Sequence, residues 1–124
     1  MFNENLINSK YIIKNRTDPI YKLKSIKNSI EIKNMKDVHI QDGVAVTKFL
    51  FWIKNTKIDK LDEIKVEKKL ESFRKQSKNF LFPSFSTIAG SGPNGAIIHY
   101  RSNKKSNRKL KKNHLLLLDS GGQY

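Results

Sequence analysis

Two stretches in the last third of the chain decide the predicted fold: SGPNGAIIHYR at residues 91–101 and LLLLDSGGQY at residues 115–124. In the first stretch, Gly and Pro predict a tight turn, and the apolar run 96–100 predicts a short strand that carries His99. In the second stretch, four consecutive Leu predict a strand that is apolar on both faces, directly followed by Asp119. We therefore expect a buried strand that places a carboxylate at its C-terminal edge.

The residues next to these stretches predict antiparallel strands. Phe85, Thr87 and Ala89 alternate with more polar positions, and the Gly-rich turn 90–95 is predicted to join them to the strand 96–100 as a hairpin. A basic loop then leads into the last strand, which we expect at residues 114–119.

Two helices are predicted upstream of the strands. From about Ser25 to Asn55, apolar residues recur close to helical spacing, which predicts one long helix or two helices that meet near Gly43. A glycine inside a helix costs about 1 kcal/mol relative to Ala, so we expect Gly43 to allow close packing or a bend. Asp62 is predicted to be the N-cap of a second helix that has Glu63 in its first turn and ends near Gln76. Helices followed by antiparallel strands indicate the α+β class.

The charge of the chain raises the question of an anionic partner. The 124 residues carry a formal net charge of +14, from 25 Lys and Arg against 11 Asp and Glu. The positive charge is mostly Lys, whereas base and phosphate recognition favours the planar, bidentate Arg. We therefore expect no specific nucleic-acid binding, although a small basic nucleic-acid-binding or interaction protein remains the alternative function.

Cysteine content and the length of the apolar runs exclude other classes. The chain contains no Cys, which excludes a disulfide framework and a thiolate metal site. The densest apolar runs, 49–53 and 115–118, are too short to cross a bilayer. We expect a cytoplasmic protein without a membrane partner.

Two side chains are candidates for chemistry, and each has a simpler interpretation. An Asp that follows a strand, such as Asp119, is often only a turn former. A histidine within a strand, such as His99, is often a partly buried structural residue. The turn 91–95 also looks like a phosphate loop, but it lacks the Lys-Ser/Thr ending and leads into a strand rather than a helix.

Both stretches resemble the aminopeptidase P (Xaa-Pro aminopeptidase) family of pita-bread metallopeptidases. DSGGQY at 119–124 is similar to the first metal-ligand strand of that family, and GPNGAIIHY at 92–100 is similar to its substrate-site histidine strand. Upstream, DPI at 18–20, KSIKN at 24–28 and HIQDGVA at 39–45 resemble the same enzymes. The resemblance implies the N-terminal half of a pita-bread fold, with Asp119 as a metal ligand. It also implies that His99 is a catalytic residue that positions the substrate or shuttles a proton.

The family resemblance also implies an incomplete site. The dinuclear centre of the family uses two Asp, one His and two Glu, and only the first Asp has a counterpart here, Asp119. We therefore expect a truncated enzyme, with residues 1–17 as a poorly defined leader and residues 18–124 as a partial catalytic domain. The parent reaction is metal-dependent removal of an N-terminal residue that precedes proline from a peptide. A single carboxylate would hold Mn²⁺ weakly, so we expect no activity unless a complementing C-terminal fragment supplies the other ligands.

Overall fold

The computed structural model describes residue 14 and residues 16–124, so most of the predicted leader lies outside the described residues. The chain divides into two compact units, residues 1–33 and residues 34–124. In the first unit, helix α2 (Pro19–Ser25) begins after Asp18, whose side chain accepts a hydrogen bond from the Ile20 N–H at 2.9 Å. Asp18 is therefore the N-cap of α2. Pro19 occupies the first helical position, where the backbone N–H has no acceptor within the helix and its absence costs no hydrogen bond.

A single long helix, α3 (Ser29–Asn55), occupies the region where one or two helices were expected. Asn28 and Glu31 start it as a capping box, because the backbone N–H of each donates to the side chain of the other, at 2.8 and 2.9 Å. The expectation that Gly43 allows close packing is wrong, since a Cβ at this position would meet no other described element within 4 Å. Gly43 lies on an exposed part of the helix.

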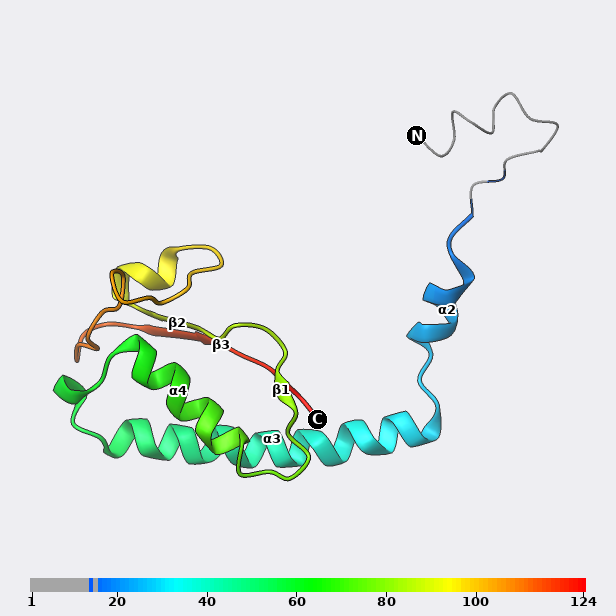
Figure 1. Ribbon diagram of the computed structural model, residues 1–124, viewed down its shortest axis with the longest axis horizontal. Coiled ribbons are helices and arrows are strands. Elements are labelled where there is room, and N and C mark those ends of the chain that lie inside the picture. Colours follow the sequence, from blue (N-terminus) through cyan, green and yellow to red (C-terminus); the bar gives the residue numbers. More distant parts are fainter. Residues whose placement is uncertain (1–13, 15) are drawn as a thin grey trace. The chain divides into compact units, whose positions relative to one another are not determined.

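Helix α4 (Glu63–Arg74) lies between α3 and the pair of strands β2 and β3 in Figure 1. The predicted N-cap is confirmed, because the Asp62 side chain accepts a hydrogen bond from the Lys65 N–H at 2.9 Å. A short 3-10 helix, η1 (Ile58–Lys60), precedes it. The buried core joins α3, α4, β2 and the loop before β3, and its members are Phe49, Leu61, Val66, Leu70, Ala89 and Leu110.

Antiparallel strands follow the helices, as predicted. Strand β2 (Ile88–Ser91) pairs with β3 (Leu116–Asp119), with Ile88 opposite Asp119 and Ser91 opposite Leu116. Strand β1 (Phe82–Pro83) pairs with β4 (Gly122–Gln123) as a second two-stranded sheet. The partner of β2 is thus β3 rather than residues 96–100, and the predicted hairpin is wrong.

The 3-10 helix η2 (Gly92–Ala96) takes the place of the predicted turn, and residues 97–100 form no strand. Pro93 lies in the first turn of η2, where its missing N–H is not required. The polar Asn94 is buried and so is Tyr100, whereas the three apolar residues 96–98 are exposed. The strand prediction failed because buried polar contacts, and not the apolar side chains, determine the path of this segment.

The strand β3 has two different faces. Leu116 and Leu118 pack against the core, whereas Leu115 and Leu117 are 89% and 46% exposed. The expectation of a strand buried on both faces is therefore wrong. We call the side formed by Leu115, Leu117 and Asp119 the open face of β3. Among the residues that the structure describes, β3 pairs only with β2, so its other edge has no strand partner.

The open face and the free edge of β3 lead us to expect self-association of the chain. Burying an exposed Leu stabilises by about 1.5–3 kcal/mol, and a free strand edge offers further backbone hydrogen bonds. The double substitution Leu115→Lys, Leu117→Lys should weaken association by more than about tenfold in light scattering coupled to size-exclusion chromatography. Ile40→Lys on α3 is the control, because Ile40 is also exposed, at 69%, but lies far from any strand in the sequence. A monomeric wild-type chain, or an equal effect of both changes, would contradict this expectation.

Candidate functional site

Asp119 is the last residue of β3 and is exposed. Successive side chains of a strand point to opposite faces, and Leu118 packs on the core. The Asp119 carboxylate therefore projects from the open face of β3, on the side away from α4. This position leaves its oxygens available to a ligand.

The segment after Asp119 is anchored at its far end by Tyr124. The Tyr124 hydroxyl donates a hydrogen bond to Asp42 Oδ1 at 2.6 Å, and its ring packs edge-on against Phe80 with the centroids 5.5 Å apart. Gly122 is required between these anchors, because a Cβ there would lie 2.9 Å from the Tyr124 ring and 3.1 Å from the Phe80 ring. The backbone that carries Asp119 is thus held on both sides.

Asp42 is the centre of a partly buried ionic cluster. Arg74, whose side chain is 3% exposed, donates to Asp42 from Nε at 2.7 Å and from Nη2 at 3.2 Å. Burial alone would raise the pKa of Asp42, but the hydrogen bonds from Arg74 and Tyr124 outweigh it and lower this pKa below 3.8. Burial and the hydrogen bond to Asp42 raise the pKa of Tyr124 from 10.0 to about 12. The cluster ties the C-terminal segment to both helices.

His99 lies on a different element from Asp119. It follows η2 in an exposed segment, and its backbone φ of 53° is in the left-handed region. In the described residues, neither His99 nor Asp119 forms a side-chain hydrogen bond or an ion pair. The structure therefore presents both predicted site residues with free side chains on separate segments.

Glu63 is an unexpected member of the polar network around the segment that carries His99. Its side chain is fully buried, yet it accepts hydrogen bonds from the Ser91 N–H at 2.7 Å, the Tyr100 hydroxyl at 2.7 Å and the Arg108 N–H at 2.9 Å. Asn94 Nδ2 also donates to both of its oxygens, at 3.0 and 3.1 Å. Burial, reinforced by the Glu63 carboxylate, raises the pKa of Tyr100 above 10.0. The sequence pattern identified Glu63 only as a first-turn acid of α4, because its partners are distant in sequence.

The donor set for a metal ion is incomplete within the described residues. An exposed carboxylate such as Asp119 suits a hard divalent cation, which prefers oxygen ligands. No group of three or more His, Asp and Glu side chains in residue 14 and residues 16–124 is arranged to hold a metal ion. Asp119 therefore fits the role of one ligand in a site that needs further donors.

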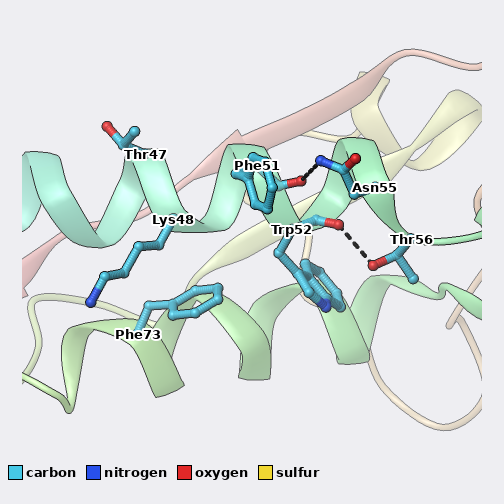
Figure 2. A pocket seen from close by; sticks show the side chains of 7 residues that line it. All are labelled: Thr47, Lys48, Phe51, Trp52, Asn55, Thr56 and Phe73. Carbon is cyan, nitrogen blue, oxygen red and sulfur yellow. Dashed lines mark hydrogen bonds between the residues drawn. The ribbon is translucent and has the colours of Figure 1, made fainter.

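A mainly apolar pocket on the helices does not carry this chemistry. It has a volume of about 570 Å³ and lies between α3 and α4, beside Trp52 and Phe73 (Figure 2). The Lys69 ammonium lies 5.6 Å from the ring centroid of Trp52 and 4.7 Å from that of Phe73. The lining of the pocket contains no carboxylate, His or Cys. It consists of Thr47, Lys48, Phe51, Trp52, Asn55, Thr56 and Phe73.

The family model described as metallopeptidase family M24 matches residues 33–124 of the chain. This chain belongs to metallopeptidase family M24. The mixture of helices and antiparallel strands, with an exposed acid at the end of β3, is therefore part of a metallopeptidase domain.

Individual relatives of this M24 chain agree with the family assignment. The Xaa-Pro aminopeptidase ApepP of Drosophila melanogaster is 44% identical over 108 residues, which are 86% of this chain and 18% of the relative. A probable Xaa-Pro aminopeptidase P of Talaromyces stipitatus is 43% identical over 109 residues, covering 86% of this chain and 17% of the relative. The chain thus spans less than a fifth of the length of these relatives.

A solved structure also matches. The X-prolyl aminopeptidase of Caenorhabditis elegans, described as a cytosolic enzyme with a di-nuclear active site, has a TM-score of 0.80 and 31% sequence identity. The match covers 87% of this chain and 18% of that one. The predicted resemblance and the predicted fold class, part of a pita-bread fold, are confirmed.

Among the described residues, no helix is both long and apolar enough to cross a membrane.

The raised pKa of Tyr124 predicts how stability changes at alkaline pH. The folded chain holds this proton up to about pH 12, whereas the unfolded chain loses it near 10.0. The contribution to stability is therefore complete below pH 10 and is lost as the pH rises towards 12. Urea titrations at about pH 9 and about pH 11.5 should show a smaller loss of stability for Tyr124→Phe than for wild type. Tyr21→Phe, at a residue that is 73% exposed, should behave like wild type. Equal losses in all three chains would contradict the assignment.

Proposed function

We propose that residues 34–124 contribute to the catalytic domain of an Xaa-Pro aminopeptidase, which removes an N-terminal residue preceding proline from a peptide. The observation that carries this proposal is the exposed carboxylate of Asp119 on the open face of β3. Membership of family M24 and the names of the relatives support the same reaction. The cytosolic description of the Caenorhabditis elegans enzyme supports a cytoplasmic location.

Asp119 is proposed as a ligand of a divalent metal ion, with Mn²⁺ as the favoured ion. The backbone that carries Asp119 is anchored by the pairing of β3 with β2 and by the Tyr124 contact with Asp42, so the point from which the carboxylate projects is set before any ion binds. The residues that follow it, Ser120 and Gly121, are small, which would let the backbone approach a bound ion closely. When bound, such ions would supply Lewis-acid activation of the scissile carbonyl and of water.

His99 is proposed as the residue that orients the substrate or moves a proton. Its imidazole is exposed, and imidazole is the side chain that most often serves as a general acid or base in catalysis. The residue would act on the scissile peptide bond or on the proline nitrogen that leaves. Its separate segment allows it to approach the substrate from a different element than Asp119.

The chain on its own is proposed to be inactive. A single carboxylate leaves a hard cation with most of its waters, so the ion exchanges freely. Asp119 therefore needs donors outside the described residues, and a complementing polypeptide that carries them would complete the site.

The test uses both the isolated chain and a chimera. We expect no release of the first residue from an Xaa-Pro-Xaa peptide by the purified chain, with or without Mn²⁺. Residues 33–124 placed in the matching segment of the Drosophila relative should give an active enzyme. In this chimera, His99→Gln should lower kcat/KM by about 10²–10⁴, and Asp119→Asn should abolish turnover.

The control for the loss of charge is Asp37→Asn, at an exposed carboxylate of α3, which should leave turnover unchanged. Full activity of the chimera with Asp119→Asn would refute the proposed role of Asp119. Turnover by the isolated chain that disappears in Asp119→Ala would refute its inactivity.

A second candidate function, the binding of nucleic acid, is supported by one feature, the basic segment 101–112. It contains seven basic residues and no acid, and all seven are exposed: Arg101, Lys104, Lys105, Arg108, Lys109, Lys111 and Lys112. Such a segment attracts polyanions through charge alone, without reading sequence. We propose that any binding of nucleic acid by this chain is weak and unspecific.

A salt series with a labelled single-stranded RNA tests this proposal. The logarithm of the binding constant should fall steeply with the logarithm of the salt concentration. Changing four lysines of the segment, Lys104, Lys105, Lys109 and Lys111, to Gln should weaken binding more than the same change at Lys33, Lys36, Lys48 and Lys54 of α3. Tight and sequence-selective binding at physiological salt would overturn the expectation.

A further inference from the structure

We propose that Glu63 is a positioning residue for His99, an inference that rests on the proposed role of His99 at the substrate site. Glu63 is the first residue of α4, and no part of its side chain is accessible to solvent. A buried carboxylate is unfavourable unless hydrogen bonds compensate its charge, so the partners of Glu63 indicate what the charge holds in place.

The partners of Glu63 lie on both sides of His99 in the sequence. Asn94, five residues before His99, donates from Nδ2 to Glu63 Oε1 at 3.0 Å. Tyr100, the residue directly after His99, donates from its hydroxyl to Glu63 Oε2 at 2.7 Å. Asn94 Nδ2 also donates to the Tyr100 hydroxyl at 2.8 Å, which closes the arrangement. One carboxylate thus ties together both ends of the segment 94–100.

The backbone of His99 needs such a restraint. A φ of 53° is uncommon for a residue with a side chain, and it persists where the surrounding structure fixes it. The ring itself is exposed, and residues 96–98 before it are exposed as well. The burial of Asn94 and Tyr100 on Glu63 is therefore what determines the direction in which His99 leaves the surface.

The remaining contacts of Glu63 fix the carboxylate relative to the fold. Ser91 at the end of β2 and Arg108 in the later loop donate backbone N–H groups to it, at 2.7 and 2.9 Å. The N-terminus of α4 adds a favourable electrostatic field for a negative charge at this position. Glu63 is consequently a rigid reference point that connects β2 and α4 to the segment that carries His99.

The direct test is hydrogen exchange in the full chain, since it needs neither metal nor substrate. The Ile97 and Tyr100 amides are protected by hydrogen bonds to the carbonyls of Asn94 and Ile97, at 3.3 and 3.2 Å. Glu63→Gln should accelerate their exchange by at least about tenfold relative to the amides of α3. Glu71→Gln is the matched control, because this acid of the same helix pairs only with Lys75 among the described residues, and it should change neither amide.

A second variant covers the case in which Glu63→Gln unfolds the chain. Tyr100→Phe removes a single hydroxyl and leaves the bonds of Ser91, Asn94 and Arg108 to Glu63 in place. It should accelerate exchange at the same two amides while α3 remains protected. Unchanged exchange at Ile97 and Tyr100 in a folded variant, or equal acceleration throughout the chain, would overturn the proposal.

The chimera separates positioning from a general role in stability. If Glu63 acts through His99, Glu63→Gln should lower kcat/KM in the parent chimera but cause little further loss when His99 is already Gln. Additive losses would show that Glu63 supports the fold and not His99. An inactive chimera would instead count against the proposed function, and the exchange result would still decide whether Glu63 holds the segment.

Discussion

The register of β2 against β3 is the constraint on which the rest of the structure depends. Ala89 lies opposite Leu118, and both face the core that α3 and α4 supply. Because strand side chains alternate, the same register sends Leu117 and Asp119 to the open face. A slip of one residue would bury the Asp119 carboxylate and expose Leu118, which the hydrophobic core strongly disfavours. Packing of two Leu side chains therefore determines where the proposed metal ligand points.

Buried charge provides the second level of organisation. Glu63 connects α4, the end of β2 and the segment around His99, whereas Asp42, Arg74 and Tyr124 connect the helices to the segment after Asp119. Each proposed site residue is exposed, but the backbone next to it is fastened to a buried or partly buried polar cluster. This arrangement keeps the functional side chains free and the backbone that carries them rigid, as a preformed site requires.

Local patterns predicted the helices and the last strand well. The apolar spacing of α3, the Asp62 cap and the Leu run of β3 are signals contained within a few residues, and the structure confirms all three elements. The predicted strand 96–100 failed because its conformation depends on Glu63, more than 30 residues away, through hydrogen bonds that no local pattern contains. The same applies to the pairing of β2 with β3 and to the open surroundings of Gly43, which depend on the assembled fold.

The central claim is that the β2–β3 register directs Asp119 to the open face, and thiol labelling tests it most directly. The chain contains no Cys, so single Asp119→Cys and Leu118→Cys variants each carry one reactive group. In the folded chain, the cysteine at 119 should react with a water-soluble thiol reagent at least about tenfold faster than the cysteine at 118. Both should react equally in urea, which corrects for intrinsic reactivity. Faster labelling at 118 than at 119 in the folded chain would contradict the register and, with it, the proposed placement of the metal ligand.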